Sequence, residues 1–187
     1  MVPLGSSRPT FSLLDVDGAP FSSTELSGSP ALVVFLCNHC PYVRHIETQL
    51  GEVLASFPGL TTVGICTNDI AAYPDDAPDR LAEQSTRAGW KFPYLVDSTQ
   101  QVGRQFAAAC TPDFFLYDAD GKLAYRGAFD DSTPGNGLPV TGELLADAIR
   151  RTIAGETVPG PHRPSMGCSI KWRTRPNVRA LGRTRGF

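Results

Sequence analysis

The sequence predicts one α/β domain in which a mixed central sheet is flanked by helices. Its 187 residues correspond to a single domain with an appendage. Short apolar runs typical of buried strands alternate with amphipathic helical stretches, and a late turn sequence joins two neighbouring strands, which makes the sheet mixed. We expect the domain to span residues 1–158. A Pro- and Arg-rich tail, 159–187, follows and packs on the domain up to about Trp172.

The composition narrows the classes of function. Hydrophobic residues make up 41% of the chain, an ordinary value for a globular domain, and the net charge of -2 argues against nucleic acid as a partner. No apolar run approaches the ~18 residues of a membrane span. The first residues contain no apolar signal-peptide core, so we expect a cytoplasmic protein with no membrane partner.

The first half of the chain contains three predicted features. Asp17-Gly18 is a turn signal, and it predicts an N-terminal hairpin that starts near Thr10. Residues 31–36 form a short, branched and aromatic run typical of a buried strand. Apolar residues then recur every three or four positions over 40–57, which predicts an amphipathic helix with Pro41 in its first turn.

The second half continues the alternation of strands and helices. The expected elements are a strand at 61–66, a helix at 78–88, a strand at 92–96, a helix at 100–107, strands at 113–117 and 123–129, and a last helix capped by Thr141 and ending before Gly155.

Cys37 and Cys40 form a C-x-x-C pair between the buried strand and the amphipathic helix. We expect the first cysteine to lie where the free N–H groups and the positive end of the helix dipole favour a thiolate. The second cysteine is expected on the first helical turn, close enough to form a disulfide. His39, between the two thiols, adds an imidazolium charge. This context predicts a redox-active dithiol.

Two other interpretations of the pair are open. In the first, both cysteines are inert core residues. In the other, Cys37, Cys40 and His45 bind a metal, although no second cluster of metal-ligating residues accompanies them. The redox dithiol is preferred to both, and no metal or other cofactor is expected.

Thr111-Pro112 precedes the predicted strand at 113–117. A proline at the first residue of a strand, in a chain that carries such a dithiol, is where a cis peptide bond is expected. An ordinary trans turn proline is the alternative.

Several segments together resemble the thioredoxin superfamily, and more closely its peroxiredoxin-like redoxins of the alkyl hydroperoxide reductase/thiol-specific antioxidant type. The resemblance implies a thioredoxin fold with an N-terminal hairpin and an inserted strand–helix unit. It also implies that cis-Pro112 faces the dithiol, that Cys37 is the nucleophile and that Cys40 is the resolving thiol. The segments that carry it are Cys37-Asn-His-Cys-Pro-Tyr-Val-Arg-His-Ile-Glu47, Cys110-Thr-Pro-Asp-Phe-Phe115, Tyr125-Arg-Gly-Ala-Phe-Asp-Asp131, Pro134-Gly-Asn-Gly137 and Gly167-Cys-Ser-Ile-Lys-Trp172.

Three departures from these families bear on the chemistry. Thioredoxins carry Trp before the first cysteine and a buried acid six residues earlier, where this chain has Leu36 and Ala31. The proton acceptor for the resolving thiol is therefore His39 or water. The threonine of the peroxiredoxin Pro-x-x-x-Thr-x-x-Cys pattern is also missing, since Val34 stands there when the count starts from Cys37. This absence argues against peroxidase activity. Because His39 resembles the residue of strongly oxidising C-x-x-C proteins, we predict a reduction potential above about -270 mV.

The remaining cysteines and arginines are expected to have lesser roles. Cys66 is expected in the core, whereas Cys110 lies near the dithiol as an auxiliary thiol. Cys168 is unreactive, or forms a second or mixed disulfide if the tail folds back over the site. Arg126 either supports a thiolate electrostatically or faces solvent. The arginines of the tail predict a solvated terminus or an anion contact; they are Arg173, Arg175, Arg179, Arg183 and Arg185.

These patterns predict a thiol–disulfide oxidoreductase. Its partners are a protein or small-molecule disulfide, held as an added strand beside Pro112, and a thiol reductant. The alternatives are a peroxiredoxin-like thiol peroxidase and a redox sensor or metal-binding protein without turnover.

Overall fold

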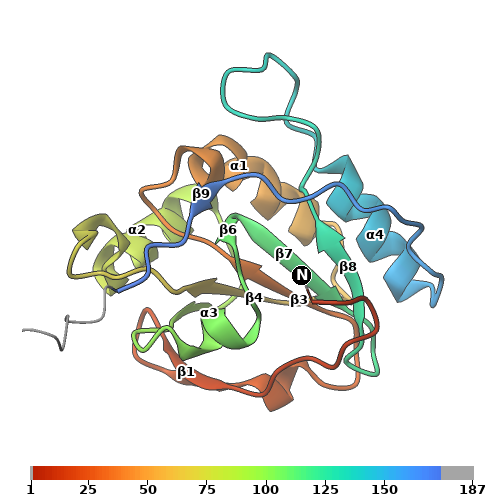
Figure 1. Cartoon of the computed structure of the whole chain (residues 1–187), viewed down its shortest axis with the longest axis horizontal. Helices are drawn as coiled ribbons and strands as arrows, with labels where there is room; N and C mark the ends of the chain where they lie inside the picture. The colour runs from red at the N-terminus through yellow and green to blue at the C-terminus, as the bar shows by residue number, and fades with distance from the viewer. Residues whose placement is uncertain (1, 174–187) are drawn as a thin grey trace, which may run out of the picture.

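The structure, a computed structural model, describes residues 2–173 and confirms a mixed sheet flanked by helices (Figure 1). Seven strands form the main sheet in the order β2-β1-β5-β4-β3-β7-β8. These strands are β1 (Ser12–Asp15), β2 (Pro20–Ser22), β3 (Ala31–Phe35), β4 (Thr61–Cys66), β5 (Tyr94–Val96), β7 (Asp113–Tyr117) and β8 (Leu123–Gly127).

Strand β3 is an interior strand of the sheet and is buried on both faces. It runs parallel to β4 and antiparallel to β7, with Val33 opposite Val63 on one side and Phe115 on the other. All five residues of the strand are buried, which explains why its sequence is a continuous apolar run rather than an alternating one. The C-terminal end of β3 leads directly to Cys37.

Helices cover both faces of the sheet. On one face, α1 (Pro41–Ala55), α2 (Pro78–Ala88) and α4 (Glu143–Ile153) contribute to the same core as Leu32 and Val34 of β3. On the other face, α3 (Gln101–Gln105) contributes to a core with aromatic rings (Figure 1). Two 3-10 turns complete the described helical elements and were not expected from the sequence; they are η1 (Ser23–Leu26) and η2 (Pro74–Asp76).

The predicted start of α1 is confirmed to within one residue, whereas the predicted cap of α4 is wrong. Helix α1 begins at Pro41 with Cys40 as its N-cap, so Cys37 lies outside the helix. Helix α4 has Gly142, not Thr141, as its N-cap. The carboxylate of Asp130 accepts the N–H groups of Thr141 and Gly142 at 2.7 and 2.8 Å, so the cap comes from a distant residue rather than from the predicted one.

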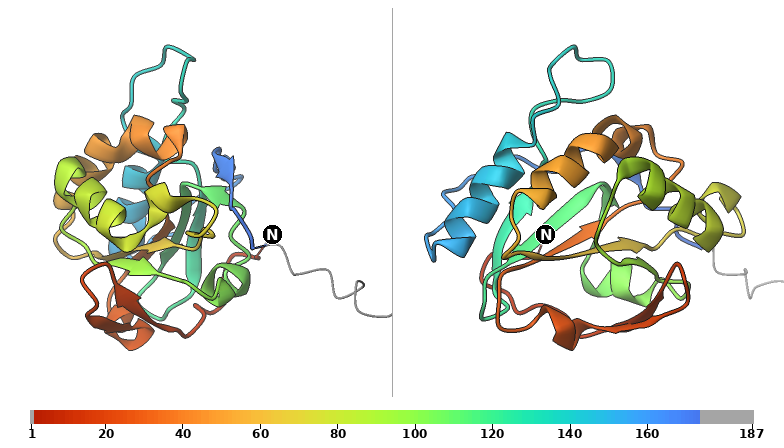
Figure 2. Two further views of the ribbon diagram at one scale, coloured as in Figure 1. Left: turned by 90° about the vertical axis from the view of Figure 1, so that its left-hand side faces the viewer. Right: turned by 180° about the vertical axis from the view of Figure 1, so that it is seen from behind.

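After α4 the tail turns back across the domain and adds a strand to it. Strand β9 (Cys168–Ser169) pairs antiparallel with β6 (Cys110–Thr111), and the views agree that the two strands lie side by side (Figures 1 and 2). The expected solvated arginines from Arg175 onward lie outside the described residues. Within residues 2–173, the helices are all too short or too polar to cross a bilayer.

Candidate active site

Three segments distant in sequence meet at the predicted dithiol: the end of β3, the start of α1, and β6. The sulfur of Cys37 lies 3.1 Å from Thr111 Oγ1, and the Cys40 thiol donates a hydrogen bond to the carbonyl oxygen of Thr111 at 3.2 Å. The Thr111-Pro112 peptide bond is cis, as expected. The structure therefore brings together Cys37, Cys40, Thr111 and Pro112.

Cys40 is the N-cap of α1, at the positive end of the helix dipole. The hydrogen bond that it receives from the Cys37 thiol lowers the pKa of Cys40 most, and burial opposes this shift. The Val43 N–H and the positive end of the helix dipole act in the same direction as Cys37. These groups lower the pKa of Cys40 and so favour its ionised form.

Cys37 has the opposite electrostatic character. The hydrogen bond that its thiol donates to Cys40 raises the pKa of Cys37, and burial and the charge of Asp76 raise it further. Helix α1 starts where the sequence predicts, and Cys37 lies three residues before its N-cap, Cys40. The expected stabilisation of a Cys37 thiolate is therefore not supported, since the surroundings of Cys37 raise its pKa.

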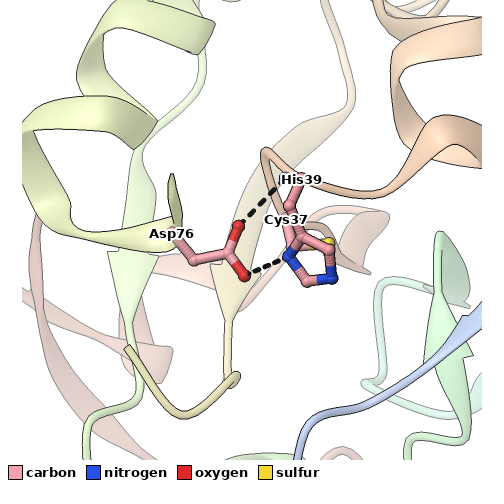
Figure 3. Close-up of side chains that lie close together, drawn as sticks. All are labelled: Cys37, His39 and Asp76. Carbon is pink, nitrogen blue, oxygen red and sulfur yellow. Dashed lines mark hydrogen bonds and ion pairs between the residues drawn. The ribbon is translucent and has the colours of Figure 1, made fainter. Parts of the chain in front are cut away.

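Asp76, in η2, organises the loop between the two cysteines and was not singled out from the sequence. Its buried carboxylate accepts the backbone N–H groups of Asn38 and His39 at 2.8 and 3.1 Å, and the side-chain amide of Asn68 at 2.9 Å. The fourth partner is His39 Nδ1, 2.7 Å away (Figure 3). The sequence shows only an acidic residue in a polar, turn-rich segment, which carries no signal that Asp76 is buried.

His39 is held against this carboxylate and beside Cys37. Its ring stacks on Tyr73 with the ring centres 4.9 Å apart, and its side chain is mostly buried. Ligand atoms of Cys37, His39 and Asp76 all lie within 4.8 Å of one another. Because each Asp76 oxygen already accepts two N–H donors, a hydrogen-bond network accounts for this cluster without a metal ion.

The metal set considered from the sequence does not assemble. His45 lies along α1, and its Nε2 is 3.1 Å from Ser132 Oγ. Among residues 2–173, the potential metal ligands that do lie together are Cys37, His39 and Asp76. This cluster shares only Cys37 with the set expected from the sequence and contains neither Cys40 nor His45.

Cys110 and Cys66 are both buried and protonated. The Cys110 thiol donates to the carbonyl of Pro112 at 3.4 Å, and burial raises its pKa to about 12. Burial also raises the pKa of Cys66, at the end of β4. Neither thiol has the environment of a nucleophile.

Arg126 interacts with Asp113 rather than with the dithiol. Its guanidinium pairs with the Asp113 carboxylate at 2.9 Å and lies 4.4 Å from the centre of the Phe115 ring. With its side chain 10% exposed, the expected solvent-facing position is wrong. Its charge lowers the pKa of the Cys110 thiol, and its support of the dithiol stays a prediction.

Cys168 is brought to the dithiol by the tail. It lies opposite Thr111 in the β6–β9 ladder, and both its thiol and its backbone N–H donate to the Cys40 sulfur. Burial, followed by the hydrogen bond to Cys40, raises the pKa of Cys168 to about 11. Strand β9 thus occupies the place beside Pro112 that was expected for a substrate strand.

Comparison with known proteins identifies the family. Residues 4–126 match the AhpC/TSA family over most of the domain. The chain belongs to the AhpC/TSA family. The fold of this AhpC/TSA protein is the thioredoxin fold, since it superposes on the thioredoxin domain of a thiol-disulfide oxidoreductase from Bacteroides vulgatus with a TM-score of 0.63. The sequence identity is 18%, and the match covers 82% of this chain and 99% of that one.

Two solved structures resemble this AhpC/TSA protein over nearly its whole length. A hypothetical protein from Sinorhizobium meliloti 1021 is 39% identical, with a TM-score of 0.91 over 94% of this chain and 97% of that one. An uncharacterized conserved protein from Geobacillus kaustophilus is 41% identical, with a TM-score of 0.90 over 94% and 95%.

Curated relatives match the AhpC/TSA protein over a shorter part. The soluble secreted antigen MPT53 of Mycobacterium tuberculosis is 29% identical over 119 residues, 63% of this chain and 64% of that protein's length. The thiol-disulfide oxidoreductase ResA of Geobacillus thermodenitrificans is 26% identical over 123 residues, 65% of this chain and 67% of ResA.

Proposed function

We propose that this protein is a thiol–disulfide oxidoreductase whose Cys37–Cys40 pair cycles between dithiol and disulfide. One observation carries the proposal: both sulfurs lie within 3.2 Å of Thr111, beside cis-Pro112, with Cys40 as the N-cap of α1. Two sulfurs in this arrangement are a thiolate and its resolving thiol. The activity in the name of ResA supports the proposal.

The charges of the two sulfurs assign their roles. The Cys40 thiolate attacks one sulfur of a disulfide that is presented to it, and the other sulfur leaves as a thiolate. Cys37 then loses its proton and attacks the Cys40 sulfur. The Cys37–Cys40 disulfide forms, and the second substrate sulfur leaves. These roles are the reverse of those that the family resemblance implies for the two cysteines.

His39 and Asp76 are proposed to accept the proton of Cys37. The two side chains are joined by a 2.7 Å contact and lie within 4.8 Å of the Cys37 sulfur (Figure 3). Cys37 must lose its proton before it can attack, and a hydrogen-bonded His–carboxylate pair is a suitable acceptor. Asp76 stands in for the buried acid that thioredoxins carry at the position of Ala31.

The geometry favours disulfide exchange over peroxide reduction. When the peroxiredoxin pattern is counted from Cys40, the position of its threonine is occupied by Cys37. A thiol there donates to the Cys40 sulfur and is positioned to form a disulfide with it. The proposed partners are therefore a disulfide substrate and a thiol reductant.

The role assignment is tested with Cys40→Ser and Cys37→Ser. Thiolate absorbance at 240 nm, measured on the reduced protein against pH, is expected to persist below pH 7 in the parent and in Cys37→Ser, and to be absent in Cys40→Ser. Cys40→Ser is expected to reduce insulin disulfides at no measurable rate. Cys66→Ala removes a core cysteine as a control and is expected to keep the parent's thiolate signal. Turnover by Cys40→Ser at the parent's rate would contradict the proposal.

A further inference from the structure

Both sulfurs of the pair are buried, and the tail lies beside Cys40. Cys37 and Cys40 are each 0% exposed, whereas Cys168 is only half-buried. Among these three neighbouring sulfurs, Cys168 is the one that solvent reaches. A disulfide in solution therefore meets Cys168 before it can meet Cys40.

The approach of the tail to the dithiol is unusually close. A Cβ atom at Gly167 would lie 2.1 Å from the carbonyl oxygen of Thr111 and 2.6 Å from its carbonyl carbon, so no other residue fits there without a shift. Cys168 follows directly and is paired with Thr111, whose carbonyl oxygen is 3.2 Å from the Cys40 sulfur. The ladder thus places the Cys168 thiol against the Cys40 sulfur.

The tail is anchored on both sides of β9. Before the strand, Ser165 Oγ donates to the carbonyl of Gly127 at 2.6 Å. After it, the Lys171 N–H donates to Asn68 Oδ1 at 2.8 Å, and the Lys171 carbonyl accepts from Gln100 Nε2 at 2.9 Å. Exposure of Cys40 by release of the tail would break all of these bonds. Exchange through Cys168 requires none of them to break.

We propose that Cys168 is a third exchange cysteine, which connects the buried Cys37–Cys40 pair to disulfides in solution through a transient Cys40–Cys168 disulfide. This inference rests on the proposed function and extends it, because it names the group that presents a disulfide to Cys40.

The relay consists of three balanced exchange steps. Cys168 attacks a substrate disulfide, forms a mixed disulfide with one substrate sulfur, and releases the other, which takes the Cys168 proton. The Cys40 thiolate then attacks the Cys168 sulfur, so the Cys40–Cys168 disulfide forms and the remaining substrate sulfur leaves as a thiolate. Finally Cys37 attacks the Cys40 sulfur. Cys168 leaves and recovers a proton that matches the one lost by Cys37. The net result is one substrate disulfide reduced and one Cys37–Cys40 disulfide formed.

Disulfide mapping in the full-length Cys37→Ser variant tests the relay. Without Cys37 the last step cannot occur, so one equivalent of oxidised glutathione is expected to produce a Cys40–Cys168 disulfide after acid quenching, alkylation and peptide mass spectrometry. Recovery of alkylated Cys168 together with a glutathione adduct on Cys40 would overturn the proposal. This experiment keeps Cys168 and does not depend on the folding of a Cys168 variant.

Kinetics with Cys168→Ser separate the relay from the proposed function. The rate of insulin reduction is expected to fall at least about tenfold, while Ser169→Ala, the next residue of the same strand, keeps the parent's rate. Equal rates for Cys168→Ser and an active parent would overturn the relay alone. A parent that reduces no disulfide would overturn the proposed function, and the relay with it.

Discussion

Two segments direct hydrogen-bond donors at the Cys40 sulfur, and they differ in origin. The N-terminus of α1 is local and supplies the N–H of Val43, whereas β9 comes from the far end of the chain and supplies the N–H and thiol of Cys168. The donor of the helix is present whenever α1 is folded. The donors of the tail reach Cys40 only while Gly167 packs against Thr111. A Cys40 thiolate is therefore stabilised by the helix at all times and by the tail only while the tail is docked. Of the two segments, only the tail also shields Cys40 from solvent.

Substitution of Gly167 by Ala is expected to remove the contribution of the tail and leave that of the helix. The added methyl overlaps backbone atoms of Thr111, and overpacking of this kind costs about 1–3 kcal/mol. If this weakens docking of the tail, alkylation of Cys40 by iodoacetamide should become about fivefold to a hundredfold faster. The measurement is the rate of carbamidomethylation of Cys40 in the reduced protein, followed by mass spectrometry.

Gly160→Ala is the matched control for Gly167→Ala. It adds the same methyl to the same tail, where the nearest atom is a backbone nitrogen 4.0 Å away, so the parent's rate is expected. Equal alkylation rates for the two variants would show that the tail does not protect Cys40.

Substitution of Asp76 by Asn tests whether its carboxylate holds the loop between Cys37 and Cys40. The carboxylate accepts four N–H groups, and an amide presents its own N–H₂ group to some of them, which leaves buried donors unpaired. We expect the free energy of unfolding in urea to fall by about 1–3 kcal/mol. Asp75→Asn, at the exposed neighbouring residue, is the control and is expected to be neutral. A stability of Asp76→Asn equal to that of the parent would show that the carboxylate does not hold the loop.

The pH dependence of stability compares the two sulfurs directly. Because the pKa of Cys40 is lower in the folded state than the ~8.5 of an unfolded thiol, the unfolded chain binds more protons between these two values. The stabilisation from Cys40 is therefore present above pH ~8.5 and is lost as the pH falls through the folded-state pKa. Cys37, whose pKa is raised, favours folding below pH ~8.5 and loses this contribution at higher pH.

Urea unfolding of the reduced protein at pH 6, 7 and 8 measures this effect. The stability difference between the parent and Cys40→Ser is expected to grow with pH, by at most about 1.4 kcal/mol per unit. A difference that does not change with pH would show that Cys40 is not the ionised sulfur.

The sequence predicts the elements near the site better than it predicts the roles of the two sulfurs. The apolar run at β3 and the three-to-four spacing of α1 predict a strand and a helix, and both are present. The helix starts within a residue of the predicted position, since a proline suits the first helical residue. The spacing does not show which of the two sulfurs the helix N-terminus favours as a thiolate.

Other parts of the site have no local signal at all. Asp76 is an acid in a polar segment, and only packing against the Cys37–Cys40 loop makes it a buried acceptor of four N–H groups. Arg126 alternates with buried residues on β8, which resembles a solvent-facing position, yet it pairs with Asp113. Long-range partners of this kind are set by how the elements pack rather than by their periodicity.

By itself the amino-acid sequence determined the mixed sheet and the position of the dithiol between a strand and a helix, because hydrophobic period and turn chemistry are local properties. That Pro112 faces the dithiol was implied by the family resemblance and not by any local pattern. Only the tertiary structure decided which of the two sulfurs is favoured as a thiolate and that Cys168 lies against it. Those features depend on hydrogen bonds and solvent exclusion between segments that are remote along the chain. Charge on a buried sulfur is determined by the groups that surround it in space.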